Sequence, residues 1–124
     1  MLSPDWSFWP AANRGLPYTD TRAVKSVILM TDGMFNTSYK NGNQNSLDPL
    51  APGSSSYQAL QLCAAMKARG ITVYTVAFQA PADAEALLQT CASAGSAFNA
   101  ASNNELRRVF REIANRIAGL RISR

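Results

Sequence analysis

An apolar run that ends at an aspartate constrains this chain more than any other stretch. Residues 24–30 are mostly aliphatic and β-branched, and Thr31, Asp32 and Gly33 close the run. A short apolar run bounded by turn residues is typical of a strand buried on both faces, as in a parallel sheet covered by helices. We therefore expect Asp32 at the carboxyl end of a buried strand, which is the edge where open α/β sheets bind ligands and ions.

Two interpretations of this segment stay open. In the first, Gly33 lets the backbone turn sharply past the carboxylate, and Thr31, Gly33 and Asn36 form a binding rim around Asp32. In the second, Asp32 and Gly33 are only a turn. Residues 35–54 are rich in Asn, Gly, Ser and Pro, which predicts a long irregular loop beside Asp32.

The composition excludes several classes of site. The 124 residues include no histidine, which excludes Ser-His-Asp and Cys-His nucleophile systems and nearly every zinc site. The two cysteines, Cys63 and Cys91, allow a disulfide, two buried thiols or one reactive group, and their spacing does not choose among these.

Charge and hydropathy set expectations about partners. The net charge of +4 comes from 12 basic and 8 acidic residues, with the surplus at the C-terminus, so we expect no nucleic-acid interface. No window is apolar enough to cross a bilayer, and the first residues lack the parts of a signal peptide. We therefore expect a soluble chain without a membrane segment.

The remaining sequence predicts alternating strands and helices. The proline-rich residues 1–22 predict an irregular segment whose aromatic side chains serve either as a lid over the chain's own helices or as a contact surface. The predicted elements after the first strand are a helix from Ser54–Ser56 to about Arg69 stopped by Gly70, a strand over 71–78, a helix from Pro81 and Asp83 to near Gly95, a strand over 97–100, and a helix opened by a capping box at Ser102 and Glu105.

Apolar spacing predicts which helix faces are buried. For the first helix these residues are Tyr57, Leu60, Cys63, Ala64 and Met66. For the second helix they are Ala84, Leu87, Leu88 and Cys91. For the last helix they are Leu106, Val109, Phe110, Ile113, Ile117 and Leu120, with Arg107, Arg108, Arg111 and Arg116 on the opposite, solvated side.

This order predicts one α/β domain of three layers, with a parallel sheet flanked by helices in the order strand, helix, strand, helix, strand, helix. We expect an irregular segment over 1–22, the core over 23–118 and a tail over 119–124. Three strands make a small sheet, and the first strand is too apolar to tolerate an open edge. An uncovered apolar edge favours pairing with another copy, so we expect a homodimer through that edge.

Three segments of the sequence carry a resemblance to a known family, namely VKSVILMTDGMFNTSY, SSYQALQLCAAMKARGITVYTVAF and LLQTCASAGSAFNAASNNELRRVFREIANRIAGLRIS. Together they resemble the C-terminal half of a von Willebrand factor A domain. More narrowly, they are similar to the TadG-like proteins of bacterial Flp (tight adherence) pilus assembly. The resemblance covers nearly the whole chain and implies a truncated, Rossmann-like domain whose intact parent has six strands.

The resemblance also implies a metal-ion-dependent adhesion site. In such domains a DxSxS loop, a separate threonine and the aspartate of TDG hold a divalent ion, usually magnesium. Asp32 matches the last of these, whereas DxSxS is missing from the sequence. Because magnesium requires near-octahedral oxygen coordination, we expect Asp32 to bind it weakly if at all here, and Mg²⁺ to belong to the intact parent domain.

Family knowledge places the parent protein outside the cytoplasm, in the periplasm or cell envelope. A Cys63–Cys91 disulfide persists in that compartment, so the resemblance implies that bond. Two buried reduced thiols are the alternative.

The leading functional hypothesis is a non-enzymatic adhesion or protein-interaction module of the pilus or adhesion machinery. The alternative is a phosphotransfer or nucleotide-binding α/β enzyme fragment that uses Asp32 at the strand end. A haloacid-dehalogenase-type site requires a nucleophile two residues before its second aspartate, where this chain has Met30. No GxGxxG follows any predicted strand, which disfavours nucleotide binding.

Overall fold

The computed structural model describes residues 3–5, 7–8, 10, 14–34, 39–40, 43–44 and 54–122. Its main sheet has three parallel strands, β1 (Ser26–Thr31), β4 (Thr72–Phe78) and β5 (Ala97–Ala100), in the order β1-β4-β5. The helices α1 (Ser55–Ala68), α2 (Ala82–Cys91) and α3 (Asn103–Ile122) follow these strands in turn. The predicted α/β class and element order are confirmed.

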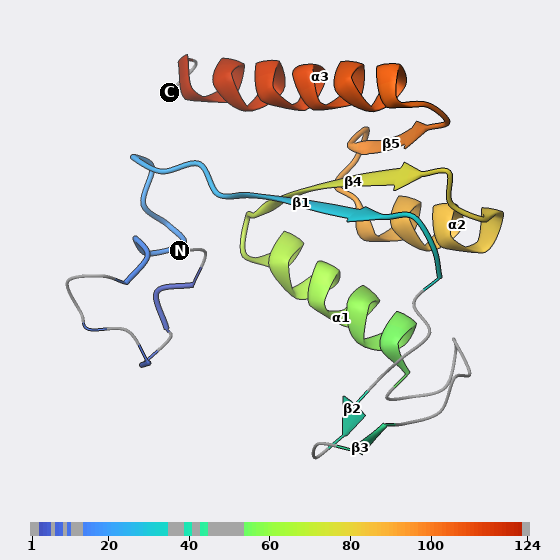
Figure 1. The fold of residues 1–124 in the computed structure, drawn as a ribbon. Coiled ribbons are helices and arrows are strands. Elements are labelled where there is room, and N and C mark those ends of the chain that lie inside the picture. Colours follow the sequence, from blue (N-terminus) through green and yellow to red (C-terminus); the bar gives the residue numbers. More distant parts are fainter. Residues whose placement is uncertain are drawn as a thin grey trace.

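The helices cover the two faces of the sheet unequally (Figure 1). Helices α1 and α2 contact each other and β4 on one face, whereas α3 packs on β5 and β4 on the other. This layering follows from the strand order, because β1, β4 and β5 advance across the sheet in one direction and same-handed crossovers place both connecting helices on one side. The result is a Rossmann-like, three-layer unit.

Strand β4 is the centre of the molecule, and its residues from Val73 to Ala77 are all buried. On the α3 side, Tyr74 and Val76 pack with Val109 and Ile113. On the other side, Val73 packs with the two cysteines. The strand that is apolar on both faces is therefore β4.

The expectation that the first strand is buried on both faces is wrong. Strand β1 lies at the sheet edge, and its Ile28 and Met30 side chains are 42% and 51% exposed. Leu29, on the opposite face of the strand, is partly buried against α1. The reason is that α3 packs on β5 and β4, so the α3-side face of the first strand is left uncovered.

Helix α1 begins and ends where the sequence predicts. The Ser54 side chain caps it by accepting a hydrogen bond from the Tyr57 amide at 3.2 Å. Gly70, just after its end, has φ +74°, a left-handed conformation that glycine adopts without strain. Tyr57 and Ala64 were expected on the buried face but are exposed, whereas Cys63 is buried. The buried stripe of α1 is therefore narrower than its apolar composition indicates.

Helix α2 ends at Cys91, earlier than the predicted end near Gly95. Gly95, at φ +69°, belongs to the turn that leads into β5.

Helix α3 is opened by the predicted cap. The Glu105 amide donates to Ser102 Oγ at 3.3 Å, and the Glu105 carboxylate accepts from the Ala101 amide at 2.7 Å. Phe110 was expected to be buried but is 39% exposed, because it lies at the margin of the face that carries Val109 and Ile113. The side chain of Leu120 lies outside the described residues.

Arg116 was expected on the solvated side of α3 with the other arginines. Its guanidinium instead donates to the Gly95 carbonyl at 2.7 Å, lies 5.1 Å from the centre of the Phe98 ring, and pairs with Glu112 at 2.6 Å. Arg116 therefore ties α3 to the turn before β5 rather than facing only solvent.

Between β1 and α1 the structure describes one element that the composition did not predict. Strands β2 (Tyr39–Lys40) and β3 (Asn43–Gln44) form a short antiparallel pair.

Within the described part of the chain, no helix is both long enough and apolar enough to cross a membrane.

Candidate functional site

Asp32 follows the last residue of β1, at the edge where all three parallel strands end (Figure 1). Its side chain is exposed. The position is the one predicted from the sequence, since carboxyl ends of parallel strands meet at one edge of a sheet. A carboxylate there faces outward, where a partner can reach it.

The turn around Asp32 is held by Thr31 rather than by the flexibility of glycine. Thr31 Oγ1 donates to the Gly33 carbonyl at 2.9 Å and accepts from the Gly33 amide at 3.2 Å. Gly33 has no left-handed φ, and a Cβ placed on it meets no atom within 4 Å. The turn therefore does not depend on a left-handed glycine at this position, and the Thr31 hydroxyl is already engaged within the turn.

The described residues supply only part of a magnesium ligand set. Among them, no group of three or more His, Cys, Asp or Glu side chains is placed to hold a metal ion. Asp32 offers one carboxylate, and Asn36, the other predicted rim residue, lies outside the described residues. Octahedral coordination requires more donors than one carboxylate provides. The assignment of Asp32 as a partial metal ligand therefore stays a prediction.

A groove of about 430 Å³ lies beside this rim and was not predicted from the sequence. Its walls come from α1, α2 and the residue after the Asp32 turn, namely Met34, Ser56, Leu60, Asp83, Ala86, Leu87 and Thr90. The Ser56 hydroxyl is buried and has no hydrogen-bond partner, so the mainly apolar lining includes one unsatisfied polar group. Asp32 and the groove together form what we call the rim surface.

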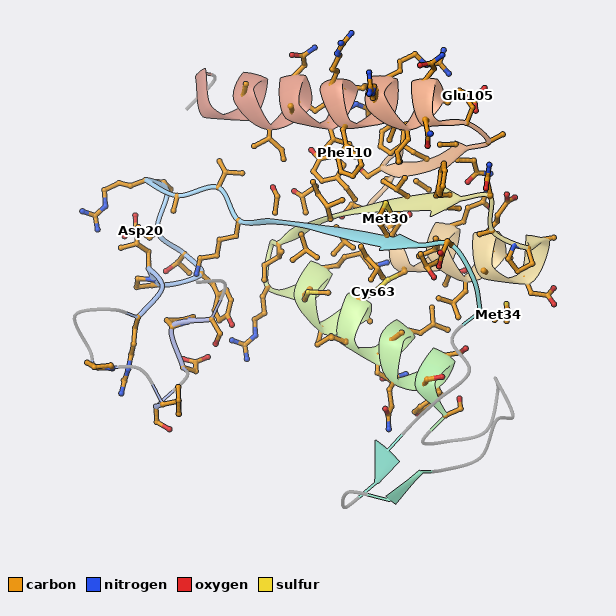
Figure 2. All side chains as sticks on the ribbon, in the orientation of Figure 1. Asp20, Met30, Met34, Cys63, Glu105 and Phe110 are labelled. Carbon is orange, nitrogen blue, oxygen red and sulfur yellow. A yellow bond between two sulfur atoms is a disulfide. The ribbon has the colours of Figure 1, made fainter. Side chains whose placement is uncertain are left out.

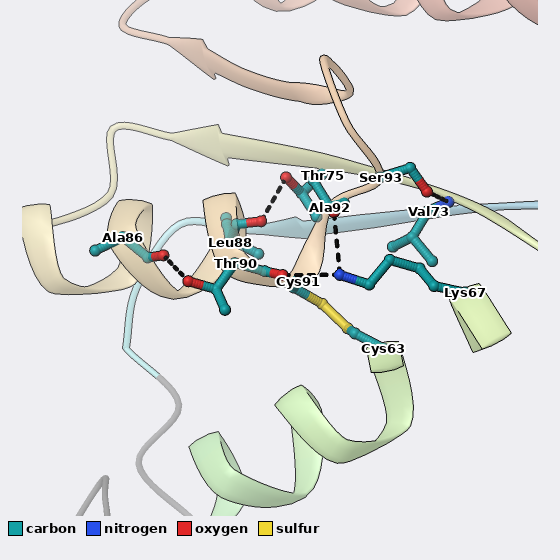
Figure 3. Close-up of a disulfide and its surroundings, with 10 residues drawn as sticks. All are labelled: Cys63, Lys67, Val73, Thr75, Ala86, Leu88, Thr90, Cys91, Ala92 and Ser93. Atoms are coloured by element: carbon teal, nitrogen blue, oxygen red, sulfur yellow. Dashed lines mark hydrogen bonds between the residues drawn. A yellow bond between two sulfur atoms is a disulfide. The ribbon is translucent and has the colours of Figure 1, made fainter. Parts of the chain in front are cut away.

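The walls of the groove are joined by a disulfide (Figure 3). Cys63 on α1 and Cys91 on α2 are bonded, with their Cα atoms 5.2 Å apart and both side chains buried. Such a separation is typical of disulfides. The predicted bond is confirmed, and it fixes the first two helices against each other.

Lys67 adds a second link between the same helices. Its ammonium group, on α1, donates to the carbonyls of Thr90 and Ala92 at 2.9 and 3.2 Å (Figure 3). The last carbonyls of a helix lack intrahelical donors and carry partial negative charge, so a cation stabilises them. Lys67 therefore acts as a C-terminal cap for α2 supplied by its neighbour.

We expect Lys67→Met to lower the free energy of unfolding by about 1 kcal/mol, because the apolar stem is kept while both hydrogen bonds are lost. Chemical denaturation measures the change. Arg111→Met, an exposed position on α3, is the matched control and should change stability by less than about 0.5 kcal/mol. Equal losses in the two variants would contradict the capping role.

The opposite end of the sheet has a second pocket, of about 260 Å³, lined by Tyr18, Lys25 and Arg69 among others. Both cations lie against the Tyr18 ring, Lys25 Nζ at 4.6 Å and the Arg69 guanidinium carbon at 4.9 Å from its centre. The part of the N-terminal segment around Tyr18 thus packs beside the end of α1 and the start of β1, and the choice between a lid and a contact surface stays open. Phe8 is exposed, and Trp6 and Trp9 lie outside the described residues.

An ion pair orders the N-terminal segment close to this pocket. Arg22 donates to the Asp20 carboxylate from Nε at 3.0 Å and from Nη2 at 2.6 Å. These hydrogen bonds, with one from the Arg22 amide, lower the pKa of Asp20 to about 2 and raise the pKa of Arg22. The Asp20 carboxylate is thus already paired with Arg22. Asp32 is therefore the better candidate for contact with a partner.

The sequence identified Asp32 and the cysteines but not the groove or Lys67.

Comparison of this chain with protein-family models, with curated proteins and with solved structures finds no match.

Proposed function

We propose that this protein is a non-enzymatic protein-interaction module of the von Willebrand factor A type, similar to the TadG-like proteins of Flp pilus assembly. The observation that carries the proposal is the rim surface, in which an exposed carboxylate at the carboxyl end of β1 adjoins a largely apolar groove. An apolar groove with a few polar groups suits an inserted side chain of a partner. Asp32 then acts as an incomplete adhesion site that orients the partner.

The chemistry around Asp32 supports binding rather than catalysis. The residue two positions before it is Met30, which is no nucleophile, and the Thr31 hydroxyl is held in the turn. Covalent catalysis requires an activated nucleophile with a base in reach, whereas the hydroxyl next to Asp32 in the sequence is hydrogen-bonded to the Gly33 backbone. Phosphotransfer at Asp32 is the alternative function.

The disulfide supports placement outside the cytoplasm. Disulfides persist in oxidising compartments and are rare where thiols are kept reduced. An extracytoplasmic location, in the periplasm or cell envelope, agrees with a partner in the pilus or adhesion machinery.

We expect Asp32→Ala to weaken binding to the partner at least tenfold while leaving stability within about 0.5 kcal/mol, because the side chain is exposed and packs in no core cluster. Interferometry against purified envelope proteins encoded near this gene measures the affinity. Asp5→Ala, an exposed carboxylate paired with Arg69 far from the rim, is the control. Phosphatase turnover that Asp32→Ala abolishes would replace the binding proposal with the enzymatic one.

The proposal includes a second contact surface, the open edge of β1. A second copy of this chain is the proposed partner at that edge. The edge is separate from the rim surface.

A further inference from the structure

The outer side of α3 carries three exposed arginines, Arg107, Arg108 and Arg111, which we call the arginine face. At about 3.6 residues per turn they fall within roughly 100° of one another around the helix. They lie nearly opposite Val109 and Ile113, which pack on the sheet. Nitrogen-tipped side chains accordingly project from the outer side of α3, away from the sheet (Figure 2).

No carboxylate of the described chain pairs with the arginine face, since its ion pairs involve other arginines. The two acidic residues of α3 are already engaged. The Glu105 carboxylate accepts a hydrogen bond from the Ala101 amide at 2.7 Å, and Glu112 pairs with Arg116 at 2.6 Å. Three positive charges therefore stand together without a counter-charge from the described residues.

The stability of α3 does not explain this arrangement. Arg107 and Arg111 are four residues apart, which places their Cβ atoms about 5–6 Å from each other, and like charges at that spacing destabilise a helix. Basic residues favour a helix in its last turn, whereas these three lie in the first half of α3. An anion bound across the arginine face would relieve the repulsion.

The geometry of the guanidinium group indicates what kind of anion fits. An arginine presents its N–H donors in a planar fork that matches a carboxylate with two parallel hydrogen bonds. In an extended chain, alternate side chains point to the same side and are about 6–7 Å apart. That spacing is close to the separation of Arg107 and Arg111, so acidic residues at alternate positions of an extended segment match the arginine face.

A protein segment fits this surface better than a lipid bilayer does. Helices that lie on membranes insert large apolar side chains beside their basic residues. The other outward-facing positions near the three arginines are Asn104, Asn115 and Ala118. Phe110, the exposed aromatic residue of α3, lies on the sheet side of the helix (Figure 2). The arginine face therefore offers charge without an apolar anchor for lipid.

The exposure of the arginine face does not depend on how the sheet continues beyond β1. Further strands beside β1 would extend the sheet in its own plane, and α3 lies over one face of that plane with the arginines directed away from it (Figure 1). Helices packed on the same face would lie next to α3 rather than over its outer side.

We propose that the arginine face binds an extended acidic segment of a protein partner, whose carboxylates at alternate positions pair with Arg107, Arg108 and Arg111. This site goes beyond the proposed function, because it lies on α3 and uses neither Asp32 nor the groove. The contacts are exposed ion pairs, so the affinity falls as the salt concentration rises.

Fluorescence anisotropy with a labelled synthetic peptide that has glutamate at alternate positions tests the proposal. We expect the wild-type chain to bind this peptide at low salt and to bind the same peptide with glutamine in place of glutamate at least tenfold more weakly. Arg111→Gln should weaken binding of the acidic peptide about fivefold, and Arg107→Gln combined with Arg111→Gln at least tenfold.

Arg14→Gln is the matched control, because it removes one positive charge from an exposed position in the N-terminal segment, and it should weaken binding less than about twofold. Equal weakening by Arg14→Gln and Arg111→Gln, or no binding of the acidic peptide up to about 1 mM, would overturn the proposal. Tighter binding to phosphatidylglycerol vesicles than to the peptide, lost in Arg111→Gln, would overturn it in favour of a lipid surface. Asp32→Ala should bind the peptide as the wild-type chain does, so failure here leaves the rim surface unaffected.

Discussion

Replacing both cysteines by alanine lowers the melting temperature by about 10–15 °C. A disulfide that closes a loop of 28 residues stabilises the folded state by about 3–4 kcal/mol in the chain-entropy model. For a domain of this size each kcal/mol corresponds to about 3–5 °C. Differential scanning calorimetry of the Cys63→Ala, Cys91→Ala variant beside the wild-type chain measures the difference.

Reductant provides the control for this experiment. Both sulfur atoms are buried, so we expect reduction of the wild-type chain to require prior unfolding, after which its melting temperature should approach that of the double variant. The double variant itself should be unaffected by reductant. A wild-type melting temperature that falls by less than about 3 °C after complete reduction would show that the bond adds little to stability.

The disulfide matters for function because of where it lies. It joins α1 and α2, whose side chains form the walls of the groove beside Asp32, and Lys67 joins the same two helices by hydrogen bonds. A fixed distance between the walls reduces the ordering cost of binding. The cross-linked pair of helices therefore preorganises the rim surface that we propose as the binding site.

Local signals in the sequence predicted the elements well. Serine caps, a left-handed glycine after α1 and apolar periodicity act within one or two helical turns, so their effect is readable from neighbouring residues. Ser54, Gly70 and the Ser102–Glu105 pair all lie where such signals place them. The parallel direction of the three main strands follows as well, since a helix separates β1 from β4 and another separates β4 from β5.

Exposure was harder to predict because it depends on what covers a face. Periodicity shows that Phe110 and Ile28 belong to apolar stripes, but not how wide the facing element is. Helix α3 lies over β5 and β4, so residues at the margins of both stripes stay accessible to solvent. A local pattern therefore predicts which residues are apolar but not which of them stay exposed.

The candidate site was predictable only where it follows one strand. Asp32 is fixed by the end of β1, which the apolar run marks. The groove depends on how α1, α2 and Met34 come together across distant parts of the sequence, and no local pattern encodes that arrangement. Arg116 is similar, since its contacts with Gly95 and Phe98 arise only once α3 packs on β5.

Ile113→Ala lowers the free energy of unfolding by about 3 kcal/mol. Ile113 is only 1% exposed and packs with Tyr74, Val76 and Val109 at the centre of the α3 side of the sheet. Truncation removes buried methylene and methyl groups and leaves a cavity that the strand on one side and the helix on the other cannot close, which costs about 2–5 kcal/mol. Urea denaturation followed by circular dichroism measures the loss.

Phe110→Ala on the same helix is the matched comparison. It removes a larger side chain, yet we expect it to cost below about 1 kcal/mol because Phe110 is already 39% exposed. If Phe110→Ala proves as costly as Ile113→Ala, then Phe110 packs within the core rather than at its margin.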